Sequence, residues 1–265
     1  MVTNVVPVLW LATSSLRNDP VPNNATKGAE VPQHLPIVLI PGLNCSLRLY
    51  TDQLPSLWQL GPVIVADHRR DDSMAAIARR ILSEAPPEFA LIGLSMGGMI
   101  AFEIMRQAAE RVAALGLLAT SARPERPEQS ERRRAQIALA EQGRFGEIPD
   151  QMFSLLSRPA DQGDIKARDF IRQMAVETGP EAFVRQQIAL MHRADSRPTL
   201  AAIRCPTLVM VGDEDRLTPP QLAMEMAEGI AGARLEAVSE CGHLCTYDQG
   251  ARVTAILTEW LRENG

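Results

Sequence analysis

A serine flanked by two glycines is the first feature of this sequence that suggests chemistry. Ser95 stands between Gly93 and Gly97, after the apolar run 89–92 and before a helical pattern that starts near Met99. A turn this tight between a strand and a helix pushes the serine hydroxyl outward. By itself the spacing also fits an ordinary Gly-Ser turn. A serine hydroxyl is a weak nucleophile at neutral pH, so it needs a histidine base and an acid that orients this base.

Three of the four histidines lie where a structural role is the simpler interpretation. His34 and His68 fall in polar loops, and His192 falls in a helix-rich region from which it could still touch a substrate. His243 differs, because it follows the last predicted strand by a short turn. Ligands of parallel sheets bind beyond the carboxyl ends of the strands, and Ser95 and His243 would both lie there.

The apolar runs supply the sheet that this arrangement requires. Short runs alternate with helical patterns, which predicts an α/β fold with a mostly parallel central sheet and helices on both faces. The expected strands are residues 36–40, 62–66, 89–92, 112–118, 205–212 and 234–238. The expected helices of this layered part, besides the one after Ser95, are 46–60, 74–84 with Ser73 as N-cap, 219–230 and 249–263.

The segment 123–199 has a different pattern from the rest of the chain. It holds no convincing strand, and its apolar residues recur at helical intervals, which predicts helices over 127–142, 147–157, 162–177 and 180–193. We interpret 123–199 as a helical cap inserted after the strand at about 112–118. The core would then consist of 36–122 and 200–265. Residues 1–35 would form an N-terminal extension or the first strand or strands, with 5–11 as the candidate.

Composition limits the class of protein. A chain of 265 residues with 46% hydrophobic residues suits one large α/β domain with an insertion. The net charge of -5 argues against nucleic acid as a partner. The four cysteines show no paired spacing typical of zinc sites, which favours free thiols in a reducing cytoplasm. Because no apolar stretch reaches membrane length, we expect a cytoplasmic protein without a membrane partner.

Three motifs together resemble the α/β-hydrolase family, and the resemblance covers the chain from about residue 36 to 261. They are Gly-Leu-Ser-Met-Gly-Gly at 93–98, a Gly-x-x-Asp-x-x-x-Pro turn at 212–219 and Cys-Gly-His at 241–243. The family carries its catalytic residues in the order Ser, acid, His. The resemblance therefore implies Ser95 as nucleophile, His243 as base and Asp215, rather than Asp213, as the acid.

The resemblance also implies an oxyanion hole made of backbone N–H groups. Its donors would be Leu43, after the first strand, and Met96, directly after the serine. The family usually carries His-Gly at the first strand end, where this sequence has Pro41-Gly42. This change keeps the Leu43 N–H and removes a side chain that would support the loop.

The implied reaction is acyl transfer to water through an acyl-enzyme on Ser95, and it needs no metal and no organic cofactor. The sequence is similar to the group of small esterases, enol-lactonases and cofactor-free haloperoxidases, so we expect a small acyl substrate, an ester or a lactone. Two alternatives stay open. One is a carbon–carbon bond hydrolase with the same triad, and the other is a hydrolase-like ligand receptor with little turnover.

The predicted cap would set specificity. Its large apolar residues can form a ceiling over the site, although we expect more than half of them to pack the cap on the sheet. They are Met152, Phe153, Leu155, Leu156, Phe170, Met174, Phe183, Ile188 and Met191. Its arginines Arg123, Arg126 and 132–134 could meet a substrate carboxylate, but a solvated helix face is the favoured interpretation. The charged run 67–72 is likewise interpreted as a solvated loop.

Overall fold

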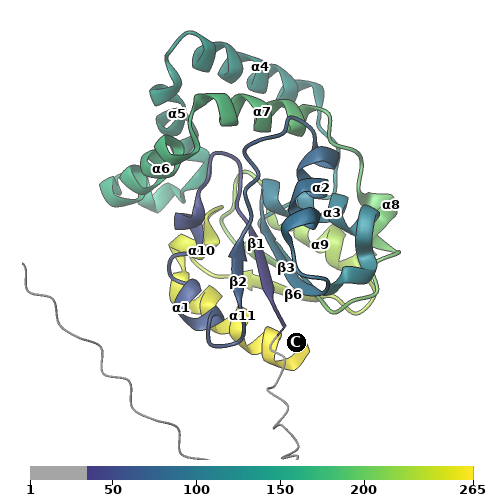
Figure 1. Ribbon diagram of the computed structural model, residues 1–265. Coiled ribbons are helices and arrows are strands. Elements are labelled where there is room, and N and C mark those ends of the chain that lie inside the picture. Colours follow the sequence, from purple (N-terminus) through teal and green to yellow (C-terminus); the bar gives the residue numbers. More distant parts are fainter. Residues whose placement is uncertain (1–34, 265) are drawn as a thin grey trace, which may run out of the picture. The chain divides into compact units, whose positions relative to one another are not determined.

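The computed structural model describes residues 35–264, and within them six strands form one sheet (Figure 1). The strands are β1 (Ile37–Ile40), β2 (Val63–Val65), β3 (Phe89–Leu94), β4 (Val112–Leu118), β5 (Thr207–Gly212) and β6 (Arg234–Val238). They lie in the order β2-β1-β3-β4-β5-β6, and every neighbouring pair is parallel. The six predicted strands are confirmed. The predictions for residues 1–34 fall outside the described residues.

Two hydrophobic cores lie on opposite faces of the sheet, because successive strand side chains alternate between the faces. Val38 and Leu91 belong to one core, and Leu39 and Ile92 belong to the other. The helices packed on the first core are α2 (Met74–Glu84), α3 (Met96–Ala108) and α9 (Pro220–Gly229). The second core is covered chiefly by α1 (Leu54–Leu57), α10 (Cys245–Asp248) and α11 (Gly250–Asn264). Figure 1 shows these two groups on either side of the strands.

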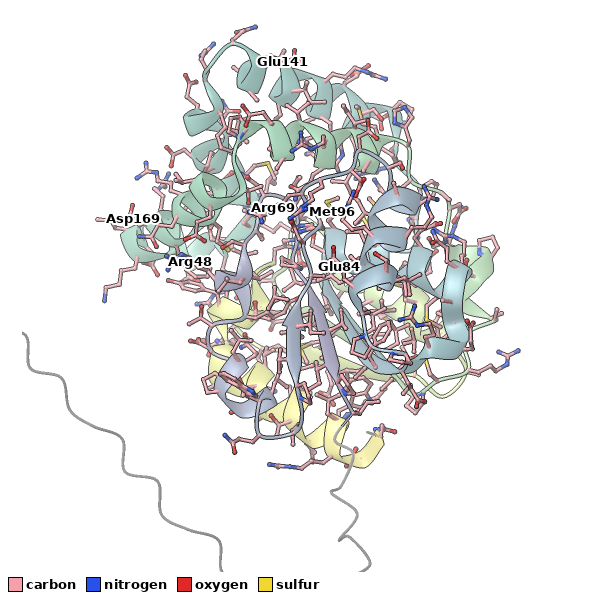
Figure 2. The ribbon with its side chains drawn as sticks, in the orientation of Figure 1. Arg48, Arg69, Glu84, Met96, Glu141 and Asp169 are labelled. Atoms are coloured by element: carbon pink, nitrogen blue, oxygen red, sulfur yellow. The ribbon has the colours of Figure 1, made fainter. Side chains whose placement is uncertain are left out.

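The chain between β4 and β5 is helical, as predicted. Its helices are α4 (Pro127–Glu141), α5 (Ile148–Leu156), α6 (Ile165–Thr178), α7 (Pro180–Met191) and the short α8 (Arg197–Leu200). Figure 1 shows α4 to α7 gathered beyond one end of the strands, and Figure 2 shows Met96 at the level where sheet and helices meet. These helices therefore cover the carboxyl ends of the strands. That they act as a separate cap domain stays a prediction.

The prediction of one helix over 46–60 is wrong. The chain forms a 3-10 turn at Leu47–Tyr50 and then the single turn of α1. Pro55 lies in the first turn of α1, where its missing N–H costs nothing, whereas in a continuous helix its ring would clash with the preceding turn. The break also lets the buried Tyr50 hydroxyl donate a hydrogen bond to the Ile40 carbonyl, at 2.8 Å. The predicted helix over 74–84 is confirmed, with the Ser73 hydroxyl as its cap.

Three backbone segments meet where β3 turns into α3. A Cβ added to Gly97 would lie 2.0 Å from the Ile40 carbonyl oxygen, and one added to Gly93 would lie 2.4 Å from the Gly97 carbonyl. Real Cβ atoms do not approach backbone this closely, so both positions require glycine. Ser95, between them, has φ 56° and ψ −114°, a conformation that L-residues rarely adopt. The contact of β1, β3 and α3 thus fixes the serine.

We predict that Gly97→Ala destabilises the protein by more than about 2 kcal/mol, because the added methyl group must separate α3 from β1. Gly146→Ala is the matched control, since an added Cβ there meets nothing within 4 Å, and its effect should stay within about 0.5 kcal/mol. Urea unfolding followed by circular dichroism measures both variants. Equal stabilities would contradict the close contact.

Candidate active site

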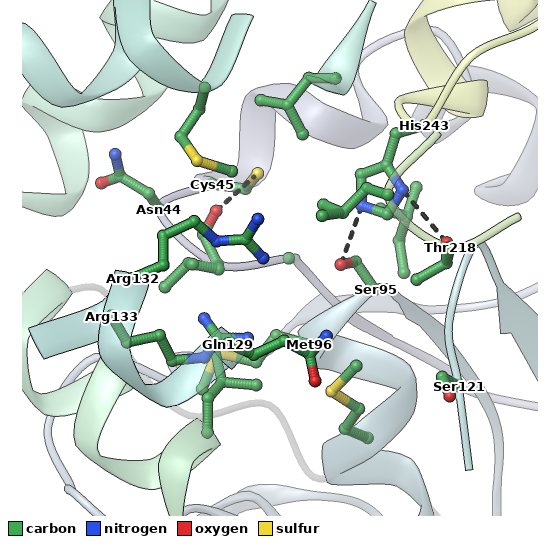
Figure 3. Close-up of a pocket in the computed structure, with 18 of the residues that line it drawn as sticks. Asn44, Cys45, Ser95, Met96, Ser121, Gln129, Arg132, Arg133, Thr218 and His243 are labelled. Carbon is green, nitrogen blue, oxygen red and sulfur yellow. Dashed lines mark hydrogen bonds between the residues drawn. The ribbon is translucent and has the colours of Figure 1, made fainter. Parts of the chain in front are cut away.

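A pocket of about 360 Å³ lies between the strand ends and the helices above them (Figure 3). The loop after β1 contributes Leu43, the turn after β3 contributes Ser95 and Met96, and the loop after β6 contributes His243. Helices α4 and α5 contribute much of the opposite wall. Residues that are far apart in the sequence therefore meet at one edge of the sheet.

Ser95, His243 and Asp215 form a continuous hydrogen-bonded chain. The Ser95 Oγ atom lies 2.9 Å from His243 Nε2, and His243 Nδ1 lies 2.8 Å from Asp215 Oδ2 (Figure 3 shows the first contact). The carboxylate can only accept, so Nδ1 carries a proton and the neutral imidazole presents Nε2 as an acceptor to the serine hydroxyl. His243 and Asp215 are almost completely buried. The three residues expected to act together are brought together.

Asp215 is held as a charged group despite its burial. Burial favours the neutral carboxyl, but the neighbouring His243 and the hydrogen bonds from His243 and Thr218 outweigh it, so the pKa of Asp215 lies below its usual value. Its Oδ1 atom accepts the N–H groups of Leu217 and Thr218, both at 2.9 Å. Asp213 instead accepts the Cys241 N–H at 3.2 Å. Of the two aspartates, the motif therefore selected the one that contacts the histidine.

The two N–H groups expected to form an oxyanion hole belong to residues that line the pocket beside Ser95. Leu43 and Met96 both border it, and a Cβ built on Gly42 would lie 3.5 Å from the Ser95 Cβ. Neither N–H donates to a backbone acceptor among residues 35–264. The N–H of Met96 also lies at the start of α3, where the helix dipole favours a negative charge.

His68 contacts the loop that carries Leu43, in line with the structural role favoured for this histidine. The interpretation of 67–72 as a solvated loop is wrong for His68 alone, because Arg69, Arg70 and Asp72 are exposed. The imidazole is 2% exposed, and its Nε2 lies 2.9 Å from the Gly42 carbonyl oxygen, to which it must donate. Burial lowers the pKa of His68, so the ring is neutral near pH 7. His68 thus supports the loop after β1, where Pro41 stands in place of the histidine that the family usually carries. His192, by contrast, is no part of the pocket lining and contacts the carbonyl of Ile188 in its own helix.

The apolar ceiling is made by four of the nine residues considered for it. Met152, Leu156, Met174 and Phe183 line the pocket. Phe153 is buried in the core beneath, and the remaining four are likewise outside the lining. Four of the nine, Phe153, Leu156, Phe170 and Met174, pack with the core on the sheet. The expectation that more than half of the nine pack the cap on the sheet stays a prediction. Asn44 and Cys45 line the pocket, whereas Ser46 turns away and donates to Glu177.

Four of the five arginines considered, Arg123, Arg126, Arg132 and Arg134, are exposed, as expected for a solvated helix face, and Arg133 is half-buried. Most of them nevertheless border the pocket. Arg123, Arg126, Arg132 and Arg133 line the pocket, and only Arg134 is outside it. Figure 3 shows Arg132 and Arg133 extending from α4 into the pocket. Helical periodicity alone does not tell which polar face of α4 would look inward, because both faces carry arginine.

Comparisons with known proteins identify the family. A profile described as "Alpha/beta hydrolase family" matches residues 37–256, which is most of the chain. The chain belongs to the alpha/beta hydrolase family. This agrees with the parallel sheet and with the motifs at 93–98, 212–219 and 241–243 on which the resemblance was based.

Relatives in this family include esterases. A thermophilic esterase from Thermogutta terrifontis, solved with malate bound, is 31% identical, with a TM-score of 0.80 over 86% of this chain and 90% of that one. A pimeloyl-[acyl-carrier protein] methyl ester esterase from Neisseria meningitidis is 25% identical over 78% of this chain and 85% of its own. The enol-lactonase from Burkholderia xenovorans shares the fold at 23% identity, with a TM-score of 0.76 over 86% and 91%. The chain spans 47% of the bifunctional biotin biosynthesis protein BioHC of Cellvibrio japonicus, at 22% identity over 84% of this chain.

Among residues 35–264, no helix combines the length and the apolar character needed to cross a membrane. The same residues contain no group of three His, Cys, Asp or Glu side chains placed to hold a metal ion.

Asp248 contacts the loop that carries His243, and we expect it to make the stability of the protein depend on pH. Its carboxylate accepts the Gly242 N–H at 2.8 Å, while burial raises the pKa of Asp248 from 3.8 to about 6. Because the folded state holds this proton more tightly than the unfolded state, its stabilising effect is complete below about pH 4 and lost as the pH rises through 6.

We therefore predict that Asp248→Asn is more stable than the wild type at pH 8, by on the order of 1–3 kcal/mol, because the amide cannot become charged. At pH 4 this advantage should vanish, since the wild-type carboxyl is then protonated. Urea unfolding of both proteins at the two pH values measures the difference. An equal difference at both pH values would contradict the buried, perturbed carboxyl.

Proposed function

We propose that this protein is a serine hydrolase that cleaves a small ester or lactone through an acyl-enzyme on Ser95. The observation that carries the proposal is the unbroken chain from the Ser95 hydroxyl through His243 to Asp215, with contacts of 2.9 and 2.8 Å. The esterase relatives in the same family support the choice of acyl transfer.

In the first half of the reaction, Ser95 Oγ attacks the carbonyl carbon while His243 Nε2 takes the hydroxyl proton. The imidazole becomes positively charged, and the adjacent Asp215 carboxylate stabilises this charge and keeps the ring in place. Thr218 donates its hydroxyl to Asp215 Oδ2 at 2.7 Å, which leaves the carboxylate little freedom to rotate. The protonated His243 then gives its proton to the leaving alcohol oxygen.

The carbonyl oxygen becomes negatively charged as the tetrahedral intermediate forms. The N–H groups of Leu43 and Met96 are the proposed donors to this oxygen, and one such donor typically contributes about 2.7–4 kcal/mol to transition-state stabilisation. Water then attacks the acyl-enzyme with His243 again as the base, and the acid is released. Helices α4 and α5, acting as a cap, would limit the access of bulk water to these charges.

We predict that Ser95→Ala and His243→Ala each lower the turnover of p-nitrophenyl butyrate by about 10⁴- to 10⁶-fold, while the proteins stay folded. The substitutions remove the nucleophile and the base, respectively. Release of nitrophenolate measures turnover, and circular dichroism controls for folding. Near-normal hydrolysis by Ser95→Ala would refute the proposal, and one acylation without sustained turnover in the wild type would favour a ligand receptor.

A second prediction tests the support of the oxyanion hole. His68→Leu should lower kcat on the same ester by about tenfold with little change in KM, because the Gly42 carbonyl loses its donor and the Leu43 N–H shifts. Loss of this buried hydrogen bond should also cost about 1–3 kcal/mol of stability. His192→Leu is the control, since His192 lies outside the pocket lining and should leave kcat unchanged. A rise in KM at constant kcat for His68→Leu would speak against the positioning role.

A further inference from the structure

The charge of the pocket lining differs from that of the protein. Arginines are plentiful among the lining residues, whereas no aspartate or glutamate of the described chain belongs to them. The lining arginines are Arg123, Arg126, Arg132, Arg133, Arg193 and Arg216. The whole chain has a net charge of -5, so this gathering is not a reflection of composition.

Helix α4 turns a polar face toward the pocket. Gln129, Arg132, Arg133 and Gln136 all line it, at spacings of three and four residues that place them on one side of a helix. Figure 3 shows Gln129, Arg132 and Arg133 reaching into the same space as Ser95. An apolar face would suffice if this helix had only to cover an apolar cavity. Apolar residues from other elements, such as Met99, Ile148 and Met152, line the pocket beside them.

Part of this basic character has a structural explanation. The side chain of Glu125 is 3% exposed and pairs with two arginines, Arg133 at 2.7 Å and Arg193. Arg133 also donates to Gln187 of α7 at 2.6 Å, so the cluster ties α4 to α7. One carboxylate between two guanidinium groups leaves a net positive charge. Burial lowers the pKa of Arg133 and of Arg193 to about 10, because removal from water disfavours the charged guanidinium groups.

Arg132 has no such explanation. Its side chain forms no ion pair and no hydrogen bond with any residue between 35 and 264, yet it points into the pocket rather than away from the protein. Its neighbour Arg134 is also exposed but lies outside the pocket. Arg132 is exposed, so water can reach its guanidinium group, but no carboxylate of the described chain balances its charge. Arg133 shares Glu125 with Arg193. The α4 wall therefore carries more positive than negative charge, and an anion bound in the pocket would balance the excess.

We propose that the substrate of this enzyme carries an anionic group, of the carboxylate or phosphate kind, which Arg132 and Arg133 bind at the α4 wall while Ser95 attacks the ester or lactone. The planar guanidinium group suits such anions because it can donate two parallel hydrogen bonds to them. The apolar lining residues would contact the carbon chain of the substrate between its anionic group and its ester or lactone. This inference rests on the proposed function and adds the class of substrate.

Matched pairs of esters test the proposal. The monomethyl esters of succinate, glutarate and adipate carry one free carboxylate, which the dimethyl esters lack at nearly the same size. We expect the wild type to prefer at least one monomethyl ester by about tenfold or more in kcat/KM. Arg132→Gln should lower kcat/KM for that ester by about 10- to 100-fold, the range for hydrogen bonds to a charged group, and leave the dimethyl ester within about twofold.

Arg134→Gln is the matched control, because it removes an exposed arginine from the same helix outside the pocket. It should change neither ester. A second arm uses carboxylate methyl esters in which a free phosphonate replaces the free carboxylate. Their kcat/KM values relative to those of the monomethyl esters tell whether a phosphate-like group or a carboxylate is preferred. Acetate esters of hydroxy acids form a third arm, in which the anion is on the alcohol side. Loss of the advantage in Arg132→Gln in any arm supports the proposal.

The failure of this inference differs from a failure of the proposed function. Equal kcat/KM for the charged and the neutral esters in every arm, or an equal fall for both in Arg132→Gln, overturns the anion site while ester hydrolysis through Ser95 stands. A protein that hydrolyses no ester overturns the proposed function instead. In that case calorimetry with glutarate and adipate decides the anion site. Binding weakened by Arg132→Gln and not by Arg134→Gln supports the site, and absence of binding refutes it.

Discussion

Contact between bare backbones at the turn from β3 into α3 is the constraint on which the site depends. The carbonyl of Ile40 occupies the space that a side chain at Gly97 would need, at 2.0 Å from its Cβ position. Ser95 is forced into a conformation that costs about 1–3 kcal/mol. The Ser95 N–H donates to the Leu118 carbonyl, and its own carbonyl accepts from Thr120, so the strained residue is bonded on both sides. The position of the hydroxyl is therefore set by the main chain.

A similar close contact between backbones lies on the other side of the pocket. A Cβ on Gly212 would lie 2.3 Å from the Cys241 carbonyl oxygen, and the Glu214 N–H donates to that oxygen at 2.9 Å. The loops after β5 and β6 thus lock together through their backbones, which sets the separation of Asp215 and His243. Two close backbone contacts, one at each end, hold the hydrogen-bonded chain to Ser95. Side-chain packing then has only to keep water and competing partners away.

Features set by residues close together in the sequence could be predicted, whereas contacts between distant residues could not. Strands, most helices and the residues Ser95, Asp215 and His243 could be predicted, because short apolar runs, turns and glycines carry them locally. The support of the Gly42 carbonyl by His68 joins residues 26 positions apart, so no local pattern reports it. The available signal was that the motif at Pro41-Gly42 lacks the usual histidine, while His68 follows the neighbouring strand. The predicted helix over 46–60 is wrong because Pro55 starts a new helical turn, although the apolar spacing continues across it.

Local patterns also did not tell which polar face of α4 lines the pocket, because both faces carry arginine. The arginines on the pocket side are residues that selection for stability alone would not favour. A buried carboxylate shared by Arg133 and Arg193 is expensive, and apolar residues of similar size at such sites are commonly neutral or stabilising. A fold that needed only to close the pocket would therefore favour an apolar face. Retaining two buried arginines beside the unpaired Arg132 makes sense when a bound anion supplies the missing negative charge. On this view the arginines lower the stability of the unliganded protein and in return favour anionic over neutral esters. A neutral ester would leave the same guanidinium groups without a partner.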